Sequence, residues 1–124
     1  LGAFVLSAGY YGKYYLKAQK VRAMIKSQLE VAFKKVDVLI TPTMPILPYK
    51  IGEKIDDPLT LYLSDINTIT ANLSGIPAIS VPFEISSSGF PIGIQLLANT
   101  LQEKKLLQAA YALQQTTHLR AMPI

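Results

Sequence analysis

The chain has 124 residues, half of them hydrophobic, a length that fits one domain or a part of a larger one with a buried core. Only 16% of the residues are charged, against about 25% in an average soluble domain, and the mean hydropathy is +0.29. We therefore expect an unusually large share of the chain to be interior, as in a segment of a larger protein. Cysteine is absent, which excludes a disulfide framework, a thiol nucleophile and a cysteine-bound metal.

An amphipathic helix is predicted over residues 12–35, because apolar residues recur there at steps of three and four. They are Tyr14, Ala18, Val21, Ile25, Leu29, Ala32 and Phe33. Most basic residues behind the net charge of +4 share this stretch, at Lys13, Lys17, Lys20, Arg22, Lys26, Lys34 and Lys35. No nucleic-acid motif accompanies them, which favours a solvated helix face over RNA or protein contact. The tyrosines at the helix start favour core packing over a ligand pocket, at Tyr10, Tyr11, Tyr14 and Tyr15.

A strand buried on both faces is predicted over residues 36–41, a short β-branched apolar run that ends at Pro42. Residues 43–57 hold two prolines and a glycine without any period. They predict a long loop of the kind that usually serves a function.

A second helix is predicted to begin at Asp57, which caps it, with Pro58 in the first helical position. Gly75 followed by Pro77 predicts its end. The apolar stripe between them is Leu59, Tyr62, Ile66, Ile69 and Leu73.

Alternating residues predict two strands of a hairpin over 78–85 and 92–96. Pro82 lacks an N–H group and places the first strand at a sheet edge or a bulge. The serines in residues 86–89 lie between these strands, with a glycine suited to a turn. A hairpin loop explains them, whereas a serine nucleophile requires a base and oxyanion donors.

The last element is a predicted helix opened by a capping box, in which Thr100 and Glu103 bind each other's backbone donors. The predicted order is helix, strand, helix, strand, strand, helix, and residues 1–124 form a single segment of α/β class. The longest uncharged run, 66–83, contains asparagine, glycine and proline, so we predict no transmembrane helix and no membrane partner.

Few residues offer chemistry. His118 is the single histidine and lies near the end of the chain, where a surface position is expected. No metalloprotease, phosphate-loop or dinucleotide motif is present, and we predict neither a catalytic residue nor a metal site in this segment.

The second helix carries a polar row of Asp65, Thr68 and Asn72, spaced three and four apart. Solvent exposure is one interpretation of this row. The other is a polar pocket, because the helix is almost uncharged and Asp65 could hold a cation such as an α-ammonium group. Spacing alone leaves both open.

Several longer motifs run along almost the entire chain. They are LSAGYY (6–11), YYLKAQKVR (14–22), DVLITPT (37–43), IGEK (51–54), YLSDI (62–66), NLSGIPAISVP (72–82) and FPIGIQL (90–96). Together they resemble the C-terminal part of the amidase signature family, and residues 51–66 resemble its tRNA-dependent amidotransferase branch in particular. Gly12 and the pair Phe83-Glu84 depart from the family pattern. Because the chain starts at Leu1 without a methionine, we expect it to begin inside a longer protein or after processing.

The resemblance implies a C-terminal part of an α/β/α sandwich with a mixed sheet. It implies a catalytic lysine and two serines upstream of this segment, so the segment alone is expected to be inactive. It also assigns to Asp65 the substrate-binding role of holding the amino group of glutamine. The arginine that would bind the glutamine carboxylate is expected just before Leu1.

The implied reaction is hydrolysis of glutamine to supply ammonia for amidating glutamate or aspartate misacylated on tRNA. The implied partners are amidotransferase subunits B and C, with tRNA reached through the complex and with ATP and Mg used by the partner subunit. The expected location is a bacterial cytoplasm or an organelle derived from one. Two alternatives remain: a fragment of a stand-alone amidase for another small amide, and a non-catalytic docking module.

Overall fold

The computed structural model describes residues 11–52 and 57–117. Its elements in chain order are η1 (Tyr11–Tyr15), α2 (Leu16–Ala32), β1 (Val38–Pro42), α3 (Pro58–Ser64), α4 (Ile66–Ser74), β2 (Ala78–Ile85), β3 (Pro91–Ala98) and α5 (Glu103–Thr116). The strands form one antiparallel sheet in the order β1-β3-β2. The α/β class is therefore confirmed, whereas a mixed sheet is not found within the described residues.

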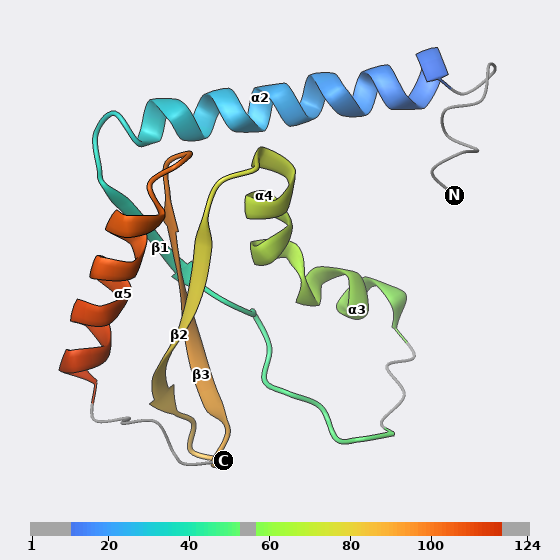
Figure 1. Ribbon diagram of the computed structural model, residues 1–124. Coiled ribbons are helices and arrows are strands. Elements are labelled where there is room, and N and C mark those ends of the chain that lie inside the picture. The colour runs from blue at the N-terminus through green and yellow to red at the C-terminus, as the bar shows by residue number, and fades with distance from the viewer. Residues whose placement is uncertain (1–10, 53–56, 118–124) are drawn as a thin grey trace.

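Helices cover both faces of the sheet (Figure 1). On one face, α5 packs against β2 and β3 around Val81, Leu96 and Ala98, with Leu106 and Ala110 from the helix. On the other face, a second cluster joins Ala71, Ile76 and Leu97 to the partly buried Leu29, Phe33 and Leu39. Alternate residues of β3 thus contribute to two cores, because successive strand side chains point to opposite faces.

Among the described residues, the body of the molecule contacts α2 from its middle to its C-terminal end, but not its start. Leu29 and Phe33 contact the second cluster, whereas Val21 is 51% exposed. Tyr14 is half exposed, so the predicted core packing is wrong for this tyrosine, because no other element within residues 11–52 and 57–117 covers the start of the helix. Tyr10, the side chain of Tyr11 and the side chain of Lys13 lie outside the described residues.

The prediction that β1 is buried on both faces is wrong. Ile40 is 61% exposed although its neighbour Leu39 packs in the second cluster. The reason is topological: β1 lies at a sheet edge, and α5 packs against β2 and β3, which leaves Ile40 uncovered.

The predicted hairpin of β2 and β3 is confirmed. β2 is an edge strand, and its pairing with β3 shifts between Pro82 and Glu84. This shift is expected, because Pro82 cannot donate a hydrogen bond to the ladder. The serines form the connecting turn, in which Ser86 Oγ accepts a hydrogen bond from the Phe90 backbone at 3.0 Å. Gly89 has φ +85°, a conformation that favours glycine. Interpreting the serines as a loop is therefore confirmed.

The capping box predicted for the last helix is wrong. α5 begins at Glu103 with Gln102 in the cap position, and no side chain caps it. The Asn99 side chain instead accepts from the Thr100 backbone at 2.8 Å, and Leu101 takes φ +60°. This turn moves the helix start beyond Thr100, and Glu103 still lies in the first turn, where the helix dipole favours an acidic residue.

Large apolar side chains are exposed over much of the described surface, particularly on α3 and α4. Leu59 is 63% exposed, and the same surface includes Leu61, Tyr62, Leu63, Ile66 and Leu73. A soluble monomer rarely exposes so many large apolar side chains on two neighbouring helices. No strand of the described residues pairs with the outer side of β1, which adds backbone donors and acceptors to the exposed surface.

We predict that the isolated 124-residue chain self-associates and binds apolar dyes, because these surfaces remain uncovered in it. Size-exclusion chromatography with light scattering, together with dye fluorescence, measures both properties. A monodisperse monomer that binds no dye and melts cooperatively would contradict this prediction.

Candidate functional site

Asp65 lies at a break in the predicted second helix. The helix starts as predicted: Asp57 accepts from the backbone of Leu59 and of Thr60, each at 3.1 Å. The Thr60 hydroxyl also donates to Asp57 at 2.6 Å. These three bonds lower the pKa of the Asp57 carboxyl, and the bond from the hydroxyl has the largest effect. The helix also ends as predicted, at Gly75 with φ +69°. Between these ends, α3 stops at Ser64 and α4 starts at Ile66.

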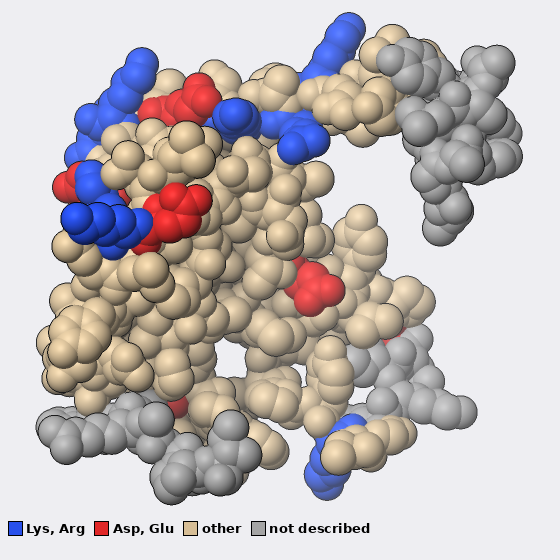
Figure 2. Space-filling view, in the orientation of Figure 1, with Lys and Arg blue, Asp and Glu red and all other residues tan. Residues whose placement is uncertain are grey.

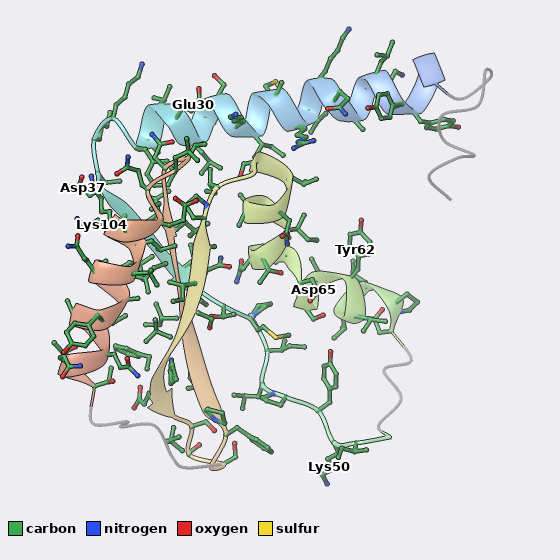
Figure 3. The ribbon with its side chains drawn as sticks, in the orientation of Figure 1. Glu30, Asp37, Lys50, Tyr62, Asp65 and Lys104 are labelled. Atoms are coloured by element: carbon green, nitrogen blue, oxygen red, sulfur yellow. The ribbon has the colours of Figure 1, made fainter. Side chains whose placement is uncertain are left out.

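The break at Asp65 has a local cause. Ser64 is buried, and its hydroxyl donates to the Leu61 carbonyl at 2.6 Å, a side-chain bond that commonly bends helices. Asp65 itself has φ −98° and ψ 0°. It is both the C-cap residue of α3 and the N-cap residue of α4. One residue therefore joins two helices, at the point labelled in Figure 3.

The backbone of Asp65, not its carboxylate, caps α4. Its carbonyl oxygen accepts from the backbone of Thr68 at 3.0 Å and of Ile69 at 3.1 Å, and from the Thr68 hydroxyl at 3.0 Å. The side chain makes no capping hydrogen bond, and Asp65 is exposed. Within residues 11–52 and 57–117, the carboxylate thus stays available to a ligand.

The polar row does not act as a unit. Thr68 donates to the Asp65 carbonyl, and Asn72 Nδ2 donates to the Thr68 carbonyl at 3.1 Å. Two of its three members therefore bond the backbone of their own helix. Asp65 is the member whose side chain makes no such bond, and it is exposed.

A second polar set lies on the sheet face next to α4. Thr41 and Ser80 are the partners of Gln95 on the two edge strands, so the three share one face. Gln95 Nε2 donates to Thr41 Oγ1 at 3.2 Å and to the Asn67 carbonyl of α4 at 3.0 Å. Sequence reasoning missed this set. The signal was a glutamine alternating with apolar residues in a strand whose two faces are both covered.

Gly93 makes room for a hydroxyl pair beside this set. Thr43 Oγ1 and Ser80 Oγ lie 2.7 Å apart across β3. A Cβ atom at Gly93 would lie 2.8 Å from Ser80 Oγ and 3.0 Å from Thr43 Oγ1. A side chain here would displace at least one hydroxyl, so only glycine fits without breaking the pair.

The predicted functional loop lines a cavity of about 730 Å³. Residues 43–49 form one wall and the β2–β3 hairpin the other, and Figure 2 shows the surface hollowed between them. The lining is mostly apolar, and its hydroxyl-bearing residues are Thr43, Ser80 and Tyr49. Asp65 does not line this cavity.

The serine hydroxyls on α3, α4 and β2 are engaged in hydrogen bonds within the described residues. Ser64 and Ser74 donate to carbonyls of their own helices, and Ser80 pairs with Thr43. Over residues 11–52 and 57–117, no three His, Cys, Asp or Glu side chains gather as metal ligands would. His118 lies outside these residues. What this part of the chain offers is one exposed carboxylate on a helix junction, which suits the binding of a cation.

The basic side chains of α2 are spread along the helix in Figure 2. Lys17, Lys20 and Lys26 are exposed. Arg22 has a structural contact, because its Nε donates to the Leu73 carbonyl at the end of α4 at 2.6 Å. No helix of the described part of the chain is long and apolar enough to span a bilayer.

The fold and the sequence together identify the class of protein. The Amidase family profile matches residues 1–107, and the chain belongs to this family. The A subunit of the glutamyl-tRNA(Gln) amidotransferase of Parvibaculum lavamentivorans is 53% identical over 99% of the chain. The chain spans only 25% of that relative's length.

Solved structures give the same result. The crystal structure of the A subunit of glutamyl-tRNA(Gln) amidotransferase from Thermotoga maritima superposes with a TM-score of 0.82 and 45% identity. The superposition covers 94% of this chain and 25% of the Thermotoga maritima chain. A 6-aminohexanoate cyclic dimer hydrolase is more distant, with a TM-score of 0.69 and 25% identity over 91% of this chain, which covers 25% of the hydrolase.

Proposed function

We propose that this chain is the C-terminal segment of the glutaminase subunit, which is the A subunit, of a tRNA-dependent amidotransferase. The observation that carries the proposal is 53% identity to such a subunit over 99% of the chain. The 45% identity to the Thermotoga maritima protein, with a TM-score of 0.82, supports it independently of the first relative. The whole subunit hydrolyses glutamine in this proposal, and the segment alone is inactive.

Asp65 is the substrate-binding residue that we propose for this segment. Its carboxylate is exposed and caps no helix, so it can accept charge-assisted hydrogen bonds from the α-ammonium group of glutamine. Its backbone is held by the bonds of Thr68 and Ile69 to its carbonyl. A fixed backbone restricts where the carboxylate can lie, which lowers the entropic cost of binding.

The remaining parts of the reaction belong to other segments. The lysine and the two serines of the catalytic triad, and the arginine for the glutamine carboxylate, lie upstream in this proposal. Subunits B and C complete the enzyme, the partner subunit uses ATP and Mg, and misacylated tRNA is bound through the complex. A bacterial cytoplasm or an organelle derived from one is the proposed location.

The exposed surfaces of this chain agree with such an arrangement. The free side of β1 is available for pairing with further strands, which would extend the small antiparallel sheet into the mixed sheet of an α/β/α sandwich. The apolar residues of α3 and α4, such as Leu59 and Tyr62, would be covered by the remainder of the domain.

A stand-alone amidase acting on another small amide is the second candidate. The fold shared with 6-aminohexanoate cyclic dimer hydrolase favours keeping it, because that enzyme has an amidase fold and a different substrate. Its identity to this chain is 25%, well below the 53% of the amidotransferase relative.

A substrate comparison tests the proposal. The full-length subunit, with and without its partner subunits, is assayed for ammonia release from glutamine and from simple aliphatic and aryl amides. We expect glutamine to be the preferred substrate and partner subunits to stimulate its hydrolysis. Preference for a simple amide, independent of partners, would favour the stand-alone amidase. Absence of any amide hydrolysis by the full-length subunit would favour the docking module.

A further inference from the structure

Gln95 is buried at the centre of the sheet, with 5% of its surface exposed. Burying a primary amide is costly unless it is hydrogen-bonded. Ser64 and Ser74, the other buried polar residues of the described part, bond carbonyls of their own helices. Gln95 differs because its side chain connects two layers of the fold.

The connection reaches the first turn of α4. Gln95 Nε2 donates to the Asn67 carbonyl at 3.0 Å, and Asn67 is the second residue of that helix, two after Asp65. The same nitrogen donates to Thr41 Oγ1 at 3.2 Å. Thr41 therefore sets the orientation of the amide from the neighbouring strand, and both NH₂ donors have acceptors.

The two ends of α4 are held in different ways. At the C-terminal end, Ala71 and Ser74 are buried, and Arg22 donates to the Leu73 carbonyl. The first turn has no buried side chain, and Ile66 is 49% exposed. Among the described residues, the bond from Gln95 is thus the specific tie between the start of α4 and the sheet.

We propose that Gln95 is a positioning residue for substrate binding. By holding the Asn67 carbonyl, it fixes the first turn of α4 and so the place of the Asp65 carboxylate. This inference rests on the proposed function, in which that carboxylate binds the α-ammonium group of glutamine. Gln95 itself touches no substrate and takes no part in the chemistry.

The test replaces Gln95 by methionine in the full-length subunit. Methionine has a similar length and volume but no N–H donor, so it removes the tie without opening a large cavity. We expect KM for glutamine to rise about three- to tenfold, as for the loss of one neutral hydrogen bond, with kcat changed by less than about twofold. Gln108→Met, on the exposed side of α5, is the matched control and should leave KM unchanged.

A purely structural role gives a different result, because a partly unfolded enzyme loses kcat in proportion to its folded fraction and keeps its KM. The Asp65→Ala background provides a second readout. There Gln95→Met should raise KM no further, since its effect acts through that carboxylate. If Gln95→Met does not fold, Thr41→Val removes the second acceptor of the amide and should raise KM about two- to threefold.

Each result bears on a distinct claim. An unchanged KM in the folded Gln95→Met variant, or in Thr41→Val where Gln95→Met does not fold, overturns the positioning role alone, provided that the wild type hydrolyses glutamine. An equal rise of KM with and without Asp65 overturns it as well. A wild-type subunit that hydrolyses no glutamine overturns the proposed function, and this inference with it.

Discussion

Replacement of Asp65 by alanine in the full-length subunit should lower kcat/KM for glutamine by about 10- to 150-fold. This range follows from a charge-assisted hydrogen bond of about 1.5–3 kcal/mol, with each 1.36 kcal/mol equal to tenfold in rate. Most of the loss should appear in KM, because in the proposed site the carboxylate contacts the amino group of glutamine, far from the amide that reacts. Steady-state assays of ammonia release measure both constants.

The same change should leave the fold intact. Asp65 is exposed, its side chain caps neither α3 nor α4, and its structural role is carried by its backbone carbonyl. The thermal midpoint of the variant should therefore match that of the wild type. Asp65→Asn keeps the side-chain shape without the charge and should give an intermediate loss.

A matched control distinguishes a site-specific effect from a general loss of negative charge. Glu30 is an exposed carboxylate on α2, apart from the α3–α4 junction (Figure 3). Glu30→Ala should leave KM and kcat for glutamine unchanged. Unchanged constants in Asp65→Ala would remove Asp65 from the binding site.

The largest effect on stability is expected from Leu96→Ala. Leu96 is 2% exposed in β3, the central strand, where it packs with Val81 and Ala98 against α5. Truncation of a buried leucine costs about 2–5 kcal/mol, because apolar contacts are lost and a cavity remains. We expect a loss of this size in the free energy of unfolding of the full-length subunit.

Urea denaturation followed by fluorescence and by pulse proteolysis measures this loss. Leu101→Ala is the matched control, since Leu101 is 82% exposed and takes φ +60°. It removes the same atoms from a site with no core contacts and should change stability by less than about 0.5 kcal/mol. Equal effects of the two variants would contradict the core assignment of Leu96.

The sequence predicted features whose causes are local. Asp57 caps a helix through bonds to residues two and three positions on, and Gly75 ends it by taking a left-handed conformation. Pro82 forces a shift in strand pairing because it has no N–H group. Each of these signals lies within a few residues of its effect, so no knowledge of the remaining chain was required.

Two wrong predictions have different causes, one a distant contact and the other a competing local turn. The apolar run of β1 suggested burial on both faces, but a strand's place in the sheet and the reach of α5 decide whether Ile40 is covered. The capping box at Thr100 is a valid local pattern, but it does not form. The Asn99 side chain binds the Thr100 backbone and Leu101 takes a positive φ, so the helix starts later. A local pattern states what a segment can form, and tertiary packing selects among the possibilities.

The same distinction between local signals and tertiary contacts applies to the candidate site. Motifs along the chain identified the family and indicated Asp65, and helical spacing placed this residue in a polar row, because both are properties of the sequence. Only the tertiary structure placed Asp65 at the junction of two helices and tied the second of them to the sheet through Gln95, which is 28 residues from Asn67. Such a contact forms only when the strand and the helix are packed together, and no periodicity along the chain encodes it.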